Sequence, residues 1–438
     1  MKRYDMKKLS ALTLALLLAF SLAACAADAN AQTVSGAANT AAQSGNSTKT
    51  DNSSTSSSTS SFSSSSGGAG VTTVAATAGG AIDASDLFSK RDLKQSAELD
   101  EAVSYSVSDG AEISITTAGV YVLSGSAKNA TVTVDAGDED KVQLVLDGLT
   151  VSNENFPVIY VKNADKVFVT TAEGSENSLS VTGTFTADGS TNTDAVIFSR
   201  DDLVLNGLGT LNISSTDNGI ACKDDLKITG GTLNVSAADA CIEANDSIAV
   251  AGGTVTVTSS KKDGLHAENE DDDKQGWIYI CGGTLQITAA DDGIHAVSIV
   301  QIDGGTLHIT AAEGIEATWV QINDGEITIS AMDDGINGGQ KSKSYTACVE
   351  INGGSLSITM GQGDTDGIDS NGKLTITGGT ISVNAQSPFD YDGTLTHTGG
   401  TILVNGSETT DISNQFGGGM GGGMGGPGGM GGFGGGGR

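Results

Sequence analysis

Hydrophobic and polar residues alternate in short runs along most of the chain, and these runs recur at a regular spacing. The segment LKITGGTLNVSAADACIEA (residues 226–244) shows one unit, in which two alternating runs flank a Gly-Gly step and a short third run follows. Alternation with a period of two predicts β-strands, and the paired glycines predict turns. The helical period of about 3.6 residues is missing throughout, so the pattern indicates an all-β protein.

The unit recurs as IYICGGTLQITAADDGIHA (278–296), VQIDGGTLHITAAEGIEA (300–317) and VQINDGEITISAMDDGINGG (320–339). The glycine of its Gly-Ile step falls at Gly219, Gly264, Gly293, Gly314, Gly335 and Gly367, with Cys241 in the equivalent place. Successive intervals are 22, 23, 29, 21, 21 and 32 residues. A unit of about 21–23 residues without a helix predicts one coil of a parallel β-helix, with loop insertions in the longer units. We expect Ile228, Leu233, Val235 and Ile242 to point into its core.

The two ends of the chain differ from the repeats in composition. Residues 1–24 combine basic residues, an apolar run and small residues, as in an export signal. The tetrad LAAC (22–25) resembles a bacterial lipobox and predicts lipidation of Cys25, although a plain secretory signal is the alternative. We therefore expect an exported protein that is lipid-anchored to the bacterial cell surface. Residues 25–95 predict a disordered tether, residues 96–410 the β-helix domain, and residues 411–438 a disordered glycine-rich tail.

Charge narrows the range of partners. The chain has 53 acidic residues against 22 Lys and Arg, which gives a formal net charge of −31. Such a field repels polyanions, so nucleic acid is not expected as a partner.

Acidic side chains recur at fixed places around the Gly-Ile step, and the coil repeat would stack them at about 4.8 Å intervals. One column precedes the glycine and contains Asn218, Ala240, Asp263, Asp292, Glu313, Asp334 and Asp366. A second lies two residues after it and contains Ala221, Glu243, His266, His295, Glu316, Asn337 and Asp369. A partial third contains Asp217, Asp239, Asp291 and Asp333. Stacked carboxylates repel one another, and oxygen-rich sites suit Ca²⁺, so these acidic and amide residues are candidate calcium ligands. Turn formation by Asp and Asn before Gly is the alternative.

Histidines and cysteines leave several alternatives open. His266 and His295 occupy the same column position in consecutive coils. They could form a transition-metal site or a pH-sensitive pair, and the alternative is that both are solvated surface residues. Cys222, Cys241, Cys281 and Cys348 match no zinc motif and are expected to be buried thiols, with a Cys222–Cys241 disulfide as the alternative.

The array from about residue 95 to 405, including AGVYVLSGSAKNATVTVDAGDEDKVQLVLDGLTVSN (118–153) and the DGI coils, resembles the bacterial cell-surface carbohydrate-binding β-helix proteins of pectate-lyase-like topology. The resemblance implies a right-handed β-helix that binds calcium and acidic plant polysaccharides such as polygalacturonate, without catalytic activity.

The basic residues favour a binding protein over an enzyme. In enzymes of the pectate-lyase-like type, which the array resembles, the base that takes the proton is usually an Arg or Lys near bound calcium. No arginine lies between Arg200 and Arg438 of this chain. Neither Gly-His-Gly nor Arg-Ile-Lys, which polygalacturonase-type enzymes carry, occurs in the chain. The leading hypothesis is calcium-bridged binding of an acidic polysaccharide. A calcium-dependent lyase that uses Lys223, Lys261 or Lys262, and a structural surface adhesin, are the alternatives.

Overall fold

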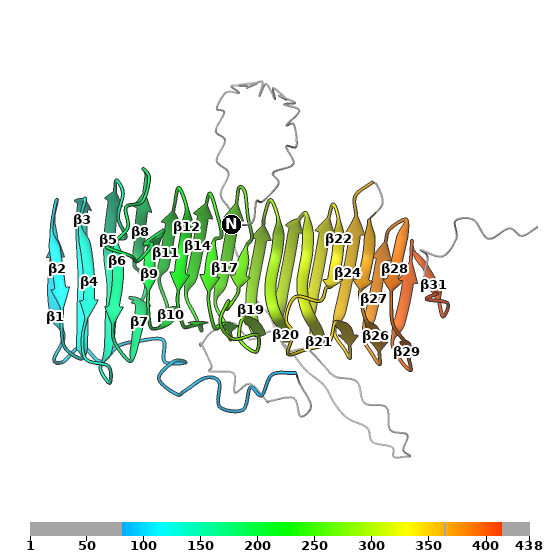
Figure 1. Cartoon of the computed structure of the whole chain (residues 1–438). Coiled ribbons are helices and arrows are strands. Elements are labelled where there is room, and N and C mark those ends of the chain that lie inside the picture. The colour runs from blue at the N-terminus through cyan, green and yellow to red at the C-terminus, as the bar shows by residue number, and fades with distance from the viewer. Residues whose placement is uncertain (1–80, 363–364, 414–438) are drawn as a thin grey trace, which may run out of the picture. The chain divides into compact units, whose positions relative to one another are not determined.

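The computed structural model describes residues 81–362 and 365–413, and every regular element in them is a β-strand (Figure 1). The predicted all-β class is confirmed. The proposed signal, Cys25, most of the proposed tether and most of the glycine-rich tail lie outside the described residues. Among the residues described, no helix has the length and apolar character needed to cross a membrane.

The strands form three ladders, in which each strand pairs with its equivalent in the next repeat unit. The first ladder comprises β2 (Glu112–Ile115), β4 (Thr131–Asp135), β6 (Ile159–Asn163), β9 (Ala195–Ser199), β12 (Asn218–Cys222), β15 (Ile242–Ala244), β18 (Leu265–Ala267), the starts of β20 (Asp292–Ala311) and β21 (Glu313–Ala331), β22 (Asp334–Gly338), β25 (Asp366–Ser370) and β28 (Ser387–Tyr391).

The second ladder comprises β1 (Val103–Val107), the first parts of β3 (Gly119–Lys128) and β5 (Lys141–Asn153), β7 (Lys166–Thr171), β10 (Asp202–Gly207), β13 (Asp225–Ile228), β16 (Ser247–Val250), the start of β19 (Trp277–Thr288), the middles of β20 and β21, β23 (Cys348–Ile351), β26 (Lys373–Ile376) and β29 (Leu395–His397). The third comprises the second parts of β3 and β5, β8 (Glu176–Val181), β11 (Thr210–Ser214), β14 (Thr232–Ala237), β17 (Thr254–Ser259), the ends of β19, β20 and β21, β24 (Ser355–Met360), β27 (Thr380–Asn384) and β30 (Thr401–Val404). These pairings are all parallel, whereas β31 (Ser407–Thr409) pairs antiparallel with β30.

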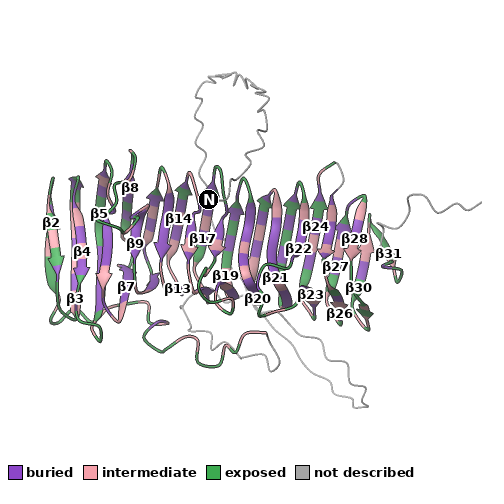
Figure 2. Cartoon of the chain, in the orientation of Figure 1, coloured by how far each residue is buried: buried purple, intermediate pink, exposed green. Residues whose placement is uncertain are grey.

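The register of the first ladder matches the repeat inferred from the sequence. Ile242 pairs with Leu265, Leu265 with Ile294, and Ile294 with Ile315, and all four side chains are buried. The predicted core positions Ile228, Leu233, Val235 and Ile242 are also buried. Figure 2 shows buried positions recurring in strand after strand. The prediction that equivalent residues of successive units lie side by side is confirmed.

Two positions show why glycine recurs at fixed places in the repeat. A Cβ on Gly293, in the Gly-Ile step, would lie 2.3 Å from Cγ2 of Ile309 and 2.7 Å from the carbonyl oxygen of Gly314. Gly305, in the Gly-Gly turn, has a φ of 100° and lies against the turn of the preceding unit. The first position has no room for a side chain, and the second needs a backbone conformation that favours glycine.

Residues 81–95 were assigned to the tether from sequence, but in the structure they pack along the outside of the second ladder. The backbone N–H groups of Ala81 and Ile82 donate to the side chains of Gln321 and Gln301 at 2.9 and 2.6 Å. Asp92 is buried and lies within 4.0 Å of the lysines Lys166 and Lys227. Residues 81–95 therefore pack against the second ladder, because these polar contacts and the contact between the rings of Phe88 and Tyr279, with centroids 6.4 Å apart, anchor the segment.

Four cysteines of the described region are free thiols. Cys222 and Cys241 therefore do not form the disulfide that was considered as an alternative. Burial raises the pKa of the Cys241 thiol to about 12, which leaves it protonated and unreactive at neutral pH.

Candidate functional site

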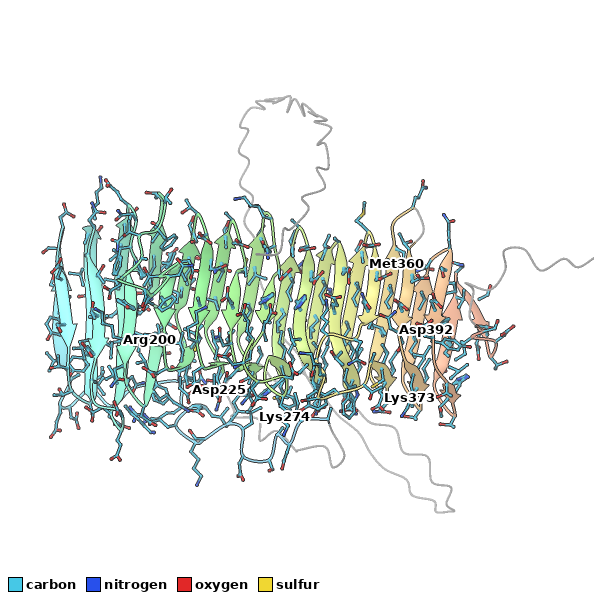
Figure 3. The ribbon with its side chains drawn as sticks, viewed as in Figure 1. Arg200, Asp225, Lys274, Met360, Lys373 and Asp392 are labelled. Atoms are coloured by element: carbon cyan, nitrogen blue, oxygen red, sulfur yellow. The ribbon has the colours of Figure 1, made fainter. Side chains whose placement is uncertain are left out.

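The outward face of the first ladder carries the column that was predicted two residues after the glycine. The register aligns, in order, Tyr160, Phe198, Ala221, Glu243, His266, His295, Glu316, Asn337, Asp369 and Asp390. The column is aromatic at Tyr160 and Phe198 and becomes polar and acidic toward the C-terminus, whereas Ser114 and Thr133 precede Tyr160 in the same register. Side chains along this series of coils are drawn in Figure 3, with Arg200 toward its N-terminal end and Asp392 toward its C-terminal end.

The column that precedes the glycine is also present, and its central members are more buried than a turn on a solvated edge would be. Asp292 pairs with Glu313, and Asp334 pairs with Asp366. The backbone N–H of Asp292 donates to Oδ1 of Asp263 at 3.0 Å, and the two residues are 5% and 3% exposed. In the partial third column, Asp291 and Asp333 are exposed, whereas Asp217 and Asp239 are half-buried.

The middle of the ladder contains a group of five residues that we call the histidine centre: Asp263, His266, Asp292, His295 and Glu316. Nδ1 of His266 lies 2.6 Å from Oδ2 of Asp263, and Nδ1 of His295 lies 2.6 Å from Oδ2 of Asp292. The two imidazole rings stack with centroids 4.8 Å apart and an interplanar angle of 16°. The coil repeat therefore duplicates one Asp-His pair in two successive units.

Glu316 connects the histidine centre to a lysine from an insertion. Its Oε2 lies 3.1 Å from Nδ1 of His295, and its Oε1 lies 2.8 Å from Nζ of Lys341. Lys341 belongs to the segment between β22 and β23. This segment lies against β21, where Oγ1 of Thr318 accepts hydrogen bonds from the backbone N–H groups of Lys341 and Ser342. The histidine centre, Lys341 and Glu313 line a cleft of about 740 Å³.

The ionisation of the histidine centre is set by these pairs. Burial disfavours a charged imidazole, but hydrogen bonds to Asp292 and Glu316 outweigh it and raise the pKa of His295 to about 10. Burial likewise favours a neutral Glu316, but hydrogen bonds from His295 and Lys341 lower the pKa of this carboxyl to about 2. The centre thus carries its own cations beside its carboxylates.

The C-terminal part of the ladder differs, and we call its residues Asp333, Asp334, Asp366, Asp369 and Asp390 the acidic stretch. Burial, together with the neighbouring carboxylates of Asp369, Asp366 and Asp333, raises the pKa of Asp334 to about 7. Burial and three aspartates raise the pKa of Asp369 to about 6. Within residues 81–362 and 365–413, no Lys, Arg or His forms an ion pair with Asp334 or Asp369.

Two further candidate ligands have partners within the chain. Glu243 accepts hydrogen bonds from Nζ of Lys223 and Nδ2 of Asn218, each at 2.9 Å. Asn337 donates from Nδ2 to Glu313 and Glu316 at 3.1 and 3.3 Å, so it links Glu313 to the histidine centre. Glu313 sits between the two, and burial followed by the charge of Glu316 raises its pKa to about 8.

Comparison with known proteins assigns this array of coils to a family. A family model described as a carbohydrate-binding domain-containing protein matches residues 109–362 and 313–413. The chain belongs to this carbohydrate-binding domain family. The matched residues include the whole histidine centre and the acidic stretch.

Two known proteins are similar to parts of this chain. A carbohydrate-binding domain-containing protein of Acetivibrio thermocellus is 41% identical over 195 residues, which span 44% of this chain and 68% of that protein. A solved structure of the polysaccharide lyase-like protein from C. thermocellum, a gadolinium derivative, is 30% identical with a TM-score of 0.46. That match covers 52% of this chain and 96% of the other.

Sequence analysis placed His266 and His295 in one column, but it missed their pairing with aspartates and the contact between Lys341 and Glu316. The repeated spacing Asp263-x-x-His266 and Asp292-x-x-His295 was a signal for the two Asp-His pairs. Lys341 gave no such signal, because its contact with Glu316 depends on the path of an insertion. Of the lysines considered for a lyase, Lys261 and Lys262 are exposed, and Lys223 is held by Glu243.

Proposed function

We propose that this chain is a lipid-anchored protein of the bacterial cell surface that binds an acidic polysaccharide of the polygalacturonate type through calcium. The array of coils is, on this proposal, a right-handed parallel β-helix that presents the first ladder to the polymer. Membership of the carbohydrate-binding domain family supports a saccharide ligand, and the lipobox-like LAAC segment supports the anchor on Cys25.

The observation that carries the calcium proposal is the acidic stretch. Asp334 and Asp369 have raised pKa values that are caused by burial and by other carboxylates. A divalent cation would offset this repulsion, and carboxylate oxygens are the ligands that Ca²⁺ prefers. The donor set is therefore suitable for calcium, with Asp333, Asp334, Asp366 and Asp369 as the residues that would hold it.

Calcium would also solve the problem of binding an anionic polymer. The chain has a formal charge of −31, so an acidic polysaccharide is repelled in the absence of a counter-ion. Ca²⁺ takes six to eight oxygen ligands, so protein carboxylates leave positions for sugar carboxylates. Repetition of acidic residues in successive coils provides several contact points for one polymer chain, which increases the overall affinity.

Retention of the full chain on immobilised polygalacturonate, with calcium or with a calcium chelator, tests the proposal. We expect retention in calcium and its loss in chelator. The double variant D334N/D369N should bind at least about tenfold more weakly, because it removes two charged calcium ligands. The matched control is D324N/E326Q, which removes the same charge from exposed positions on β21.

Four outcomes would contradict parts of the proposal. Undiminished retention in chelator would exclude calcium bridging. Equal loss in the two double variants would point to net charge rather than to the acidic stretch. Release of unsaturated uronate products, measured by ultraviolet absorbance, would show the lyase alternative, whereas absence of retention on any glycan with calcium present would favour the adhesin.

A further inference from the structure

The histidine centre brings one imidazole nitrogen and two carboxylate oxygens close together. Nδ1 of His295 lies 2.6 Å from Oδ2 of Asp292 and 3.1 Å from Oε2 of Glu316. The ligand atoms of these three residues all lie within 4.8 Å of one another. Asp292 and Glu316 are 5% and 8% exposed, so these are buried charged donors rather than solvated surface groups.

The surrounding residues fix the orientation of these donors. Lys341 and Asn337 both donate to Oε1 of Glu316, and this leaves Oε2 directed at His295. His295 itself is held by stacking on His266. Metal ligands in proteins are oriented by such hydrogen bonds from a second layer of residues, and a solvated cluster would lack them.

The imidazole distinguishes this group from the acidic stretch. Calcium and magnesium select oxygen ligands, whereas a nitrogen donor beside two carboxylates suits zinc and related first-row ions. We propose that Asp292, His295 and Glu316 form a binding site for a first-row transition-metal ion, with Zn²⁺ as the probe ion. The ion takes the place of the proton on Nδ1 of His295, which is released to solvent.

The geometry favours His295 over His266 as the nitrogen ligand. The rings are nearly parallel at 16°, so the in-plane lone pairs of the two imidazoles do not converge on a common point between them. His266 also has its own partners, Asp263 through Nδ1 and Glu268 through Nε2. His266 therefore supports the site from the neighbouring coil without being a ligand.

The cleft in front of the donors supplies the open position that a fourth ligand needs. It has a volume of about 740 Å³ and is lined by all three proposed ligands. Bonds of about 2.1 Å in a tetrahedral site place donor atoms about 3.4 Å apart. The donors would separate by several tenths of an ångström to admit the ion, and a water or a saccharide oxygen would complete the tetrahedron.

Calorimetric titration of Zn²⁺ into the full chain, without a histidine tag and with excess calcium present, tests this site. We expect one zinc site in the wild type, weakened at least about 100-fold in H295Q and in E316Q, because each removes a direct ligand. H266Q should retain zinc binding within about tenfold, since it changes only a supporting residue. The matched control H308Q alters another histidine of β20 outside the centre and should leave the affinity unchanged.

Visible absorption of the Co²⁺-loaded chain gives a second measurement, which reports the coordination of the bound ion rather than its affinity. An intense d–d band, lost in H295Q, is expected for a four-coordinate site with a nitrogen ligand. A spectrum like that of hydrated Co²⁺, or equal zinc affinity in H295Q and wild type, would overturn the proposal. The zinc site does not depend on the proposed polysaccharide function, because calcium-dependent retention is tested through D334N/D369N and zinc binding through H295Q.

Discussion

The histidine centre and the acidic stretch occupy neighbouring repeat units of the same ladder, yet the charges of their carboxylates are compensated in different ways. Both place carboxylates before the Gly-Ile step and two residues after it. In the centre, His295 and Lys341 lie against Glu316 and lower the pKa of its carboxyl. In the acidic stretch, Asp334 and Asp369 have carboxylates as the neighbours that shift their pKa values upward.

This difference shows that the position of a carboxylate in a column does not by itself determine its ionisation. A carboxylate in this ladder is neutralised by a cationic residue of the neighbouring repeat unit or of an inserted loop. Histidine at the second-column position supplies such a cation within the site, whereas the acidic stretch, on the calcium proposal, takes its cation from solution. Predictions that alter one region at a time can therefore separate the two cases.

The largest effect is expected from removing the imidazole of the centre with H295Q. This variant leaves the buried carboxylates of Asp292 and Glu316 without the cation between them, and loss of one partner of a buried pair is costly. We expect the free energy of unfolding in metal-free buffer to fall by about 2–3 kcal/mol. Urea unfolding at neutral pH measures it, and H308Q should have little effect.

The pH dependence of that loss follows from the raised pKa of His295. The folded value of about 10 lies above the ordinary value of 6.5, so the stabilisation is complete below pH 6.5 and disappears as the pH rises through about 10. The difference between wild type and H295Q should therefore shrink across this window. A difference that grows with pH would show that His295 is neutral in the folded protein.

Much of this arrangement was predictable from the sequence, because it depends on periodicity. The alternation and the Gly-Ile step predicted which residues share a column, and His266 and His295 do stack. The packing of residues 81–95 was not predictable, since it uses backbone N–H groups that bond to Gln301 and Gln321. Such contacts join segments more than two hundred residues apart and leave no periodic signal.

The ionisation of the candidate ligands could not be predicted from the sequence either. Glu313 and Glu316 are three residues apart on one strand, yet the pKa of the first is raised to about 8 and that of the second is lowered to about 2. Burial acts on both, and the presence of His295 and Lys341 beside only one of them decides the sign. Composition and spacing carry no information on which carboxylate a distant lysine reaches.

An intermediate effect is expected from K341M, which removes the inserted cation from the centre. Glu316 keeps its contact with His295 and loses the one with Lys341, whose side chain is 31% exposed. We expect a loss of about 1 kcal/mol in the free energy of unfolding, because the group is partly solvated. The control K343M changes a lysine two residues away that is 89% exposed and lies 4.0 Å from Asp273. Equal losses in both variants would mean that the loop, rather than the ion pair, stabilises the centre.

The smallest effect, and the one with the opposite sign, is expected from D334N in metal-free buffer. The folded pKa of Asp334 is about 7 and its ordinary value is 3.8, so stability is complete below pH 3.8 and decreases as the pH rises through about 7. Asparagine removes this cost, and we expect D334N to be more stable than wild type by about 0.5–1 kcal/mol under mildly alkaline conditions, after allowing for solvent screening.

Calcium should make the wild type more stable than D334N, because the wild type gains a bound ion that D334N holds weakly. Thermal unfolding of both proteins, with chelator and with calcium, measures the reversal directly. If D334N is the less stable protein in chelator as well, the acidic stretch is already neutralised from within. The two regions would then differ in which groups neutralise them, and the case for a divalent ion would have to rest on retention of the polysaccharide alone.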